Sequence, residues 1–197
     1  NKGENIKMNK KNNYIWLFGE NLSNTANNNS FYFWKHIVNK KKEDINKYII
    51  LKKNKANEEI YKSLNDKEKK SVVWRNSFKM ADMFFVTLSY KDIMPDSEIK
   101  KNKYVTIPTV YLQHGVTAIK KLGYRGFAYN NNMLRFIYYN KNIKQQLKSE
   151  NDFRDYQLFY GEYMPRWKEL VQRYEKNKKD KGLHKISWFL IIYKQIY

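Results

Sequence analysis

The chain has 197 residues, of which 42% are hydrophobic and 17% aromatic, so it can form one domain with a substantial core, or one domain and the start of another. Its formal net charge of +20 favours an anionic partner: a phosphate-bearing substrate, an anionic membrane surface or a nucleic acid. The absence of cysteine excludes disulfide bonds and thiolate metal sites, and is typical of a cytosolic protein.

Short apolar runs alternate with polar or amphipathic segments along the first half of the chain. Residues 1–13 form a polar lead-in, and residues 14–18 predict a buried strand that ends at Gly19. After an asparagine-rich loop, Ser30 is the expected N-cap of a helix that contains the next aromatic run. The other elements expected here are strands at 47–51, 71–74 and 83–90, a short charged helix at 56–64 and a helical turn at 78–81.

The second half continues this alternation. Pro108 precedes an expected strand at 109–113, which runs directly into His114-Gly115. The other expected elements are a surface connection at 99–105, strands at 135–139 and 157–160, a polar helix at 141–149 and a helix from Pro165 to about Lys176. Strands that alternate with helices predict a parallel, doubly wound α/β sheet with helices on both faces, whose ligands bind at the carboxyl ends of the strands.

His114 is the leading candidate for a catalytic residue. It follows an expected strand, so it would lie at the ligand-binding edge, where Gly115 leaves room beside the imidazole. The alternative is a structural histidine held in place by hydrogen bonds. His36 and His184 are expected to have no functional role, and Gln113 either orients a neighbour or fills space. The sequence contains no glycine-rich nucleotide-binding motif, no nucleophile elbow and no metal-ligand cluster.

Three stretches of the sequence resemble the CDP-glycerol glycerophosphotransferase family, which includes the primases and polymerases of teichoic acids and related capsule enzymes. In chain order they are residues 16–34 (WLFG, an asparagine-rich loop and FYFW), 114–123 (HG followed by KKLG) and 163–170 (YMPRWKEL). Tyr163 and Lys168 stand where the family prefers Gly and Asp. The link between the His-Gly pair and the two lysines is one residue longer than in the family.

The resemblance implies a GT-B-like architecture of two Rossmann-like halves, in which this chain would be the N-terminal, acceptor-side half. Residues 14–180 would form one Rossmann-like domain, and residues 181–197 would be the start of, or the linker to, a donor-binding domain. The implied reaction transfers glycerol phosphate from CDP-glycerol to a lipid-linked (poly)glycerol phosphate or glycan acceptor. It uses CDP-glycerol as the donor substrate and requires no metal or other cofactor.

The resemblance also implies roles for individual residues. His114 would be the general base that takes the proton of the acceptor hydroxyl, which attacks the β-phosphorus of CDP-glycerol while CMP leaves. Gly115, Lys120, Lys121 and Arg166 would contact the substrate, and the three cationic side chains would stabilise the phosphoryl oxygens. The implied location is the cytoplasmic face of the cell membrane, as a peripheral protein on an anionic surface. No specific nucleic acid is expected as a partner.

Two other classes of function remain open. A basic α/β module that binds nucleic acid without catalysis would also need positive charge interleaved with aromatic residues. Against it, the aromatic residues fall inside apolar runs, which is typical of a core, and no RNA- or DNA-binding motif occurs. The third class is a non-catalytic membrane-surface protein, because the lysine-rich segment 176–185 precedes Trp188, Phe189 and Leu190.

Overall fold

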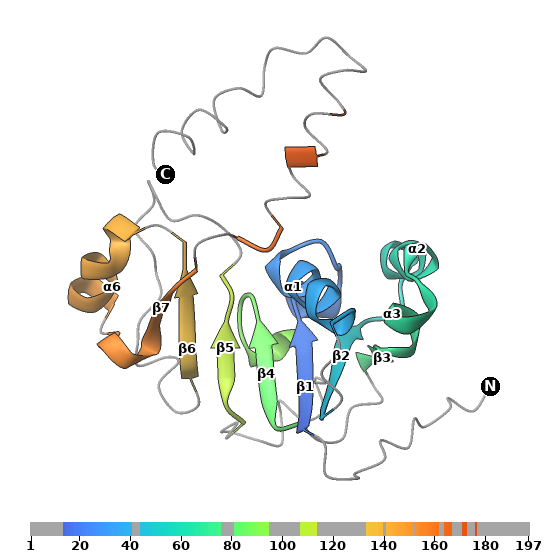
Figure 1. Ribbon diagram of the computed structural model, residues 1–197, viewed down its shortest axis with the longest axis horizontal. Helices are drawn as coiled ribbons and strands as arrows, with labels where there is room; N and C mark the ends of the chain where they lie inside the picture. The colour runs from blue at the N-terminus through green and yellow to red at the C-terminus, as the bar shows by residue number, and fades with distance from the viewer. Residues whose placement is uncertain are drawn as a thin grey trace.

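The computed structural model describes residues 14–40, 44–75, 81–94, 107–113, 133–139, 141–151, 153–161, 164–166, 171, 172 and 176. They form a seven-stranded sheet in which every strand pair is parallel, in the order β3-β2-β1-β4-β5-β6-β7 (Figure 1). The strands are β1 (Tyr14–Gly19), β2 (Ile45–Leu51), β3 (Val72–Trp74), β4 (Met83–Val86), β5 (Thr109–Tyr111), β6 (Met133–Tyr138) and β7 (Leu158–Tyr160). The predicted parallel α/β fold, which is Rossmann-like, is confirmed.

Helices and single 3-10 turns connect the strands. The α-helices are α1 (Asn29–Val38), α2 (Lys55–Ser63), α3 (Asp66–Lys70) and α6 (Lys144–Asn151), and the 3-10 turns are η1 (Asn21–Ser23), η3 (Tyr90–Asp92), η4 (Lys141–Ile143) and η5 (Asp155–Gln157). Helices α1, α2 and α3 are each preceded by an asparagine whose side chain accepts a backbone N–H of the first turn: Asn28, Asn54 and Asn65. The asparagine-rich composition therefore supplies helix N-caps.

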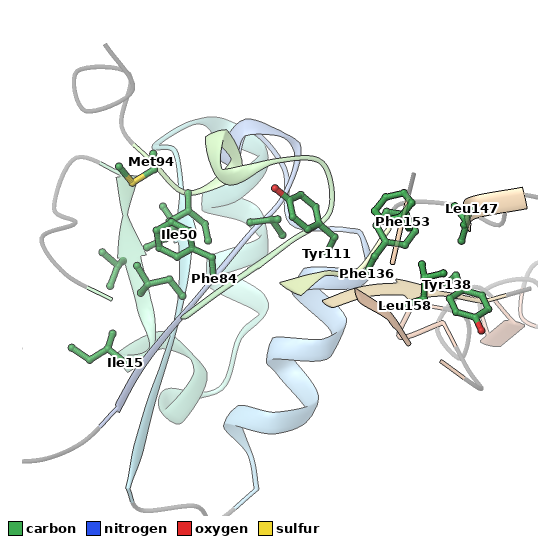
Figure 2. Packing of buried hydrophobic residues seen from close by; sticks show 14 of the residues in the cluster. Ile15, Ile50, Phe84, Met94, Tyr111, Phe136, Tyr138, Leu147, Phe153 and Leu158 are labelled. Carbon is green, nitrogen blue, oxygen red and sulfur yellow. The ribbon is translucent and has the colours of Figure 1, made fainter. Parts of the chain in front are cut away.

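Buried side chains form two apolar clusters, one on each face of the sheet. Alternation along β1 places Ile15 and Leu17 in the first cluster and Phe18 in the second. The first cluster extends across the sheet as far as Leu147 of α6 (Figure 2). The second packs against α1, where Trp34 is fully buried. Strands that are buried on both faces explain why the strand sequences read as continuous apolar runs.

Gly19 at the end of β1 allows η3 to pack against this strand. A Cβ atom at this position would lie 2.5 Å from the carbonyl oxygen of Asp92 and 2.6 Å from a side-chain carbon of Ile93. Both distances are shorter than a non-bonded contact allows, so any other residue would push η3 away. The glycine that stops the first apolar run is thus required by a contact with a segment about 70 residues further along the chain.

The N-cap of α1 differs from the prediction. Asn28, not Ser30, has the extended N-cap conformation, and its Oδ1 accepts the N–H of Asn29 at 2.9 Å. Ser30 lies inside the helix, where its hydroxyl donates to the carbonyl of Phe85 in β4 at 2.9 Å. The serine therefore fastens the helix to the sheet, while the asparagine two positions earlier begins the helix.

Two strands end earlier than predicted, and one helix was not predicted. The strand expected at 83–90 ends at Val86, because the Asp92 carboxylate takes the N–H groups of the next three residues. The strand expected at 109–113 lies inside the sheet, between β4 and β6, but ends at Tyr111. Helix α3 is a single turn of charged residues, and an Asn65–Glu68 capping box begins it.

Some expectations fall outside the described residues. These include the lead-in at 1–13, residues 78–80 of the helical turn, the connection at 99–105 and the segment at 181–197. In the helix expected from Pro165 to Lys176, residues 171, 172 and 176 are described and helical, whereas Pro165 and Arg166 form a turn. Within the part of the chain that the structure describes, no helix is long and apolar enough to cross a lipid bilayer.

Candidate active site at the carboxyl edge of the sheet

Ligands of doubly wound sheets bind beyond the carboxyl ends of the strands, where the strand order reverses. That point lies between β1 and β4, because successive strands are added outward from β1 on one side and from β4 on the other. All strand arrowheads point to the same edge in Figure 1. The residues that follow β1 and β5 at this edge are Glu20, Leu112 and Gln113, and each is buried.

Glu20 occupies the N-terminal end of α1. Its Oε1 accepts the N–H groups of Asn27 and Asn28 at 2.5 and 2.6 Å, and its Oε2 accepts the N–H of Phe31 at 3.0 Å. Burial raises the pKa of Glu20 to about 7, against the opposing effect of these three donors. Since the Glu20 carboxyl group already holds these three N–H groups, they are not available to an external anion.

Asn29, the first residue of α1, connects two segments that are distant in sequence. Its Nδ2 donates to the carbonyl oxygens of Leu112 at 3.2 Å and Gln113 at 2.7 Å. Its Oδ1 accepts the backbone N–H of Arg166 at 3.3 Å. The Tyr139 hydroxyl donates a further hydrogen bond to the carbonyl of Leu112 at 2.9 Å. Asn29 therefore fixes the end of β5 against the segment that carries Arg166.

Arg166 presents a partly buried positive charge at this edge. Its Nη1 donates to Oδ1 of Asn28 at 3.3 Å, and its buried Nε has no hydrogen-bond partner in the part of the chain that the structure describes. Among the described residues no carboxylate lies within ion-pair distance of it. In Arg75, by contrast, both Nη groups donate to main-chain carbonyls, those of Leu22 and Met94, and so stabilise the fold. A partly buried guanidinium without a counter-charge is suited to an anionic ligand.

One of the five residues proposed from the sequence can be located, and it lies at the expected edge. Arg166 is tied through Asn29 to Gln113, the residue immediately before His114. The other four, His114, Gly115, Lys120 and Lys121, lie outside the described residues. No group of three or more His, Cys, Asp or Glu side chains that could hold a metal ion occurs among the described residues.

Sequence reasoning missed Glu20, Asn28 and Asn29, which were assigned to a polar loop. A signal for the two asparagines exists in the sequence: Asn28 and Asn29 lie directly before Ser30 and the aromatic run of a helix, where N-capping residues occur. Glu20 follows a buried strand directly, which is where a carboxyl group reaches the edge of a parallel sheet. The hydrogen bond from the N–H of Arg166 to Oδ1 of Asn29 spans 137 positions and has no local signal in the sequence.

The burial of several large aromatic side chains argues against the alternative hypothesis that the protein binds nucleic acid. Phe18, Trp34 and Phe84 are fully buried, and Phe136 is 2% exposed. These rings stabilise the two apolar clusters and cannot stack on bases. Their burial agrees with the expectation that the aromatic runs belong to the core.

No protein-family model matches this chain, and a search of the curated proteins finds no match to it. The resemblance to the CDP-glycerol glycerophosphotransferases therefore stays a prediction that rests on the three sequence stretches.

Proposed function

We propose that the protein transfers glycerol phosphate from CDP-glycerol to a lipid-linked (poly)glycerol phosphate or glycan acceptor. The observation that supports this proposal best is the Arg166 guanidinium, a partly buried cation whose Nε lacks a partner. It lies at the carboxyl edge of the sheet, bonded through Asn29 to the residue before His114. A phosphate group is the ligand class that an arginine in this setting recognises best.

In the proposed mechanism His114 takes the proton of the acceptor hydroxyl as its oxygen attacks the β-phosphorus. A neutral imidazole in this role is worth about 10²- to 10⁴-fold in rate. The bond from the β-phosphorus to the CMP oxygen breaks, and CMP leaves with the electron pair. Arg166, Lys120 and Lys121 stabilise the charge on the phosphoryl oxygens, since the N–H groups held by Glu20 cannot do so.

The proposal includes the location of the reaction. A lipid-linked acceptor would bring the protein to the cytoplasmic face of the membrane, where a net charge of +20 favours contact with anionic lipids. Surface charges of this kind are screened beyond about 8 Å at physiological ionic strength, so binding to acidic vesicles should fall steeply as salt is added. Equal binding to neutral and acidic vesicles would contradict this part of the proposal.

The phosphate site is tested by calorimetric titration of sn-glycerol 3-phosphate and CDP-glycerol into the chain. Arg166→Met should weaken binding by about tenfold to a hundredfold, because a charged hydrogen bond is worth about 1.5–3 kcal/mol. Arg154→Met is the matched control, because it removes the same charge from an exposed residue that precedes β7, at the opposite edge of the sheet. Equal effects of the two substitutions would show that only net charge matters.

The chemical step is tested in the complete protein by CMP release from CDP-glycerol. His114→Ala should abolish release while circular dichroism stays unchanged. His114→Gln should be equally inactive, since an amide cannot accept the proton at neutral pH. A folded His114→Ala protein with near-normal turnover would exclude the role of His114 as a base. Tight, base-dependent binding of single-stranded DNA or RNA, without binding of CDP-glycerol, would favour the nucleic-acid module instead.

A further inference from the structure

Gln113 combines two unfavourable features at the carboxyl end of β5. Its side chain is 2% exposed, yet neither Oε1 nor Nε2 has a hydrogen-bond partner among the described residues. Its φ is 51°, in the left-handed region that residues other than glycine rarely adopt. Buried amide groups are almost always hydrogen-bonded in folded proteins, so an unpaired one calls for an explanation.

The main chain around Gln113 is firmly held, so the unpaired amide does not result from a loosely fixed segment. The N–H of Leu112 donates to the carbonyl of Val86 at 2.8 Å, which extends the pairing of β5 with β4. The carbonyl of Gln113 accepts from Asn29 at 2.7 Å. The main chain is therefore held by hydrogen bonds at both Leu112 and Gln113. The side chain of Gln113, in contrast, makes no hydrogen bond to the described part of the fold.

Other buried amides of the described chain are used by the fold. Asn57 donates from Nδ2 to the carbonyls of Ser23 and Lys52, and the Oε1 of Gln157 accepts the N–H of Arg154. Both polar atoms of the Asn29 side chain, Nδ2 and Oδ1, also form hydrogen bonds. Among the described residues, only Gln113 has a buried side chain with two unpaired polar atoms. The described part of the fold therefore leaves this amide available to a ligand.

We propose that Gln113 is a specificity-determining residue, whose amide binds an uncharged hydroxyl group of the ligand that Arg166 holds by its phosphate. This role rests on the proposed function and deepens it. A carboxamide both donates and accepts, which matches a hydroxyl group and not a fully ionised phosphate oxygen. Asn29 holds the main chains of Gln113 and Arg166 close together, because its amide bonds the backbone carbonyl of the first and the backbone N–H of the second.

A hydroxyl bound here would be recognised strongly. The bond would form at a side chain that is almost completely withdrawn from water, where the competing hydrogen bonds of solvent are lost. A ligand with phosphate but no hydroxyl would leave the amide unpaired, as it is in the free protein, and would gain nothing from Gln113. Arg166 would therefore determine whether a phosphate binds, and Gln113 would select phosphates that carry a neighbouring hydroxyl.

The test compares two ligands, sn-glycerol 3-phosphate and inorganic phosphate, by calorimetric titration into the 197-residue chain. Gln113→Met keeps the length of the side chain and removes both polar atoms. It should weaken binding of glycerol 3-phosphate by about tenfold and leave inorganic phosphate unchanged. Its melting temperature should equal or exceed that of the wild type, because two unpaired buried atoms are removed. Arg166→Met, in contrast, should weaken both ligands.

Two outcomes would overturn the role of Gln113. In the first, Gln113→Met and the wild type bind glycerol 3-phosphate equally well. In the second, Gln113→Met binds glycerol 3-phosphate and inorganic phosphate more weakly by the same factor. If Gln113→Met does not fold, Gln113→Gly, which relaxes the left-handed backbone, is measured by the same criteria. A wild-type chain that binds neither ligand would refute the phosphate site and the role of Gln113 together, whereas failure of the discrimination alone would refute only Gln113.

Discussion

Among the described residues, those other than glycine with positive φ lie in two turns at the carboxyl edge of the sheet, and the two turns differ in their hydrogen bonds. In the η1 turn after β1, the Asp92 carboxylate accepts the N–H of Leu22, and the Ser23 hydroxyl donates to the carbonyl of Asp92. Arg75 donates to the carbonyl of Leu22. Gln113, after β5, also has a positive φ, but its buried amide has no hydrogen-bond partner among the described residues. Backbone strain alone therefore does not mark a ligand site; the unpaired polar group distinguishes one turn from the other.

The largest effect is expected from removing the carboxylate of Asp92, a residue of η3 that holds the η1 turn by a hydrogen bond. This fully buried carboxylate accepts four backbone N–H groups, those of Leu22 at 2.8 Å and of the three residues after β4 at 2.8 to 3.3 Å. Asp92→Ala should lower the free energy of unfolding by about 4 kcal/mol in urea titrations. Asp155→Ala, which removes an exposed carboxylate paired only with Lys144 and Lys148, is the control. Similar losses in both variants would contradict the assigned role of Asp92.

The second prediction concerns pH and Glu20, which immediately precedes the same turn. Burial raises the pKa of Glu20 from 4.5 to about 7, so the folded chain holds this proton more tightly than the unfolded chain. The resulting stability is fully present below pH 4.5 and is lost as the pH rises to about 7, by on the order of 3 kcal/mol. The side chain of Glu20→Gln has no titratable proton, so the free energy of unfolding of this variant should not show this decrease with pH.

The measurement is the free energy of unfolding of the wild type and of Glu20→Gln at several values from pH 4.5 to 8. The wild-type value minus the variant value should decrease over this range and then level off. Glu59→Gln, on the exposed side of α2, removes a carboxyl group that is not buried and is the control. A difference that is constant with pH would show that the three N–H donors balance the burial of Glu20, and one that increases would show that they outweigh it.

The third prediction concerns Asn29, which holds the turn after β5 through the carbonyl of Gln113. Asn29→Asp places a carboxylate against the buried carbonyls of Leu112 and Gln113, to which it cannot donate. The free energy of unfolding should fall by about 2 kcal/mol at pH 7. Part of the loss should be regained near pH 4, because a protonated carboxyl group can donate to one carbonyl. Asn21→Asp, at an exposed position in η1, should show neither effect.

The smallest effect is expected at Leu22, whose φ is 54° and whose side chain is 37% exposed. Leu22→Gly should raise the free energy of unfolding by about 0.5–1 kcal/mol, because the relief of the left-handed conformation outweighs the greater flexibility of glycine in the unfolded chain. Leu22→Ala keeps the Cβ atom and should give no increase. Neither substitution should change phosphate binding; weaker binding in either variant would mean that η1 belongs to the site.

The fold could be predicted from sequence because its main signal is local. Residues 14–18 and 48–51 are apolar runs of strand length, and polar or amphipathic helices lie between such runs. Element ends were less predictable, because distant or non-apolar groups set them. The end of β4 depends on the carboxylate of Asp92, and the start of α1 depends on Asn28 together with Glu20. None of these three residues stands out by its hydrophobicity.

The candidate site was predictable only in part, for a related reason. Arg166 was identified through its place in a family-like stretch, not through any local chemistry. Its lack of an acidic partner among the described residues and its bond to Asn29 depend on three-dimensional contacts. Gln113 was left without an assigned role, since a sequence does not show which amides end up buried and unpaired. Hydrogen bonds between distant segments are thus the part of the site that patterns do not reveal.

The strand order allows the sheet to grow outward from β1 while the chain is being synthesised. Each strand joins a free edge of the sheet that earlier strands have built: β2 beside β1, β3 beside β2, β4 on the other side of β1, and β5, β6 and β7 in turn beyond it. No strand has to be inserted between two that are already paired. A four-stranded sheet with apolar residues on both faces can therefore form from residues 14–94 before Thr109 leaves the ribosome, and it offers the β4 edge to the strands still to come.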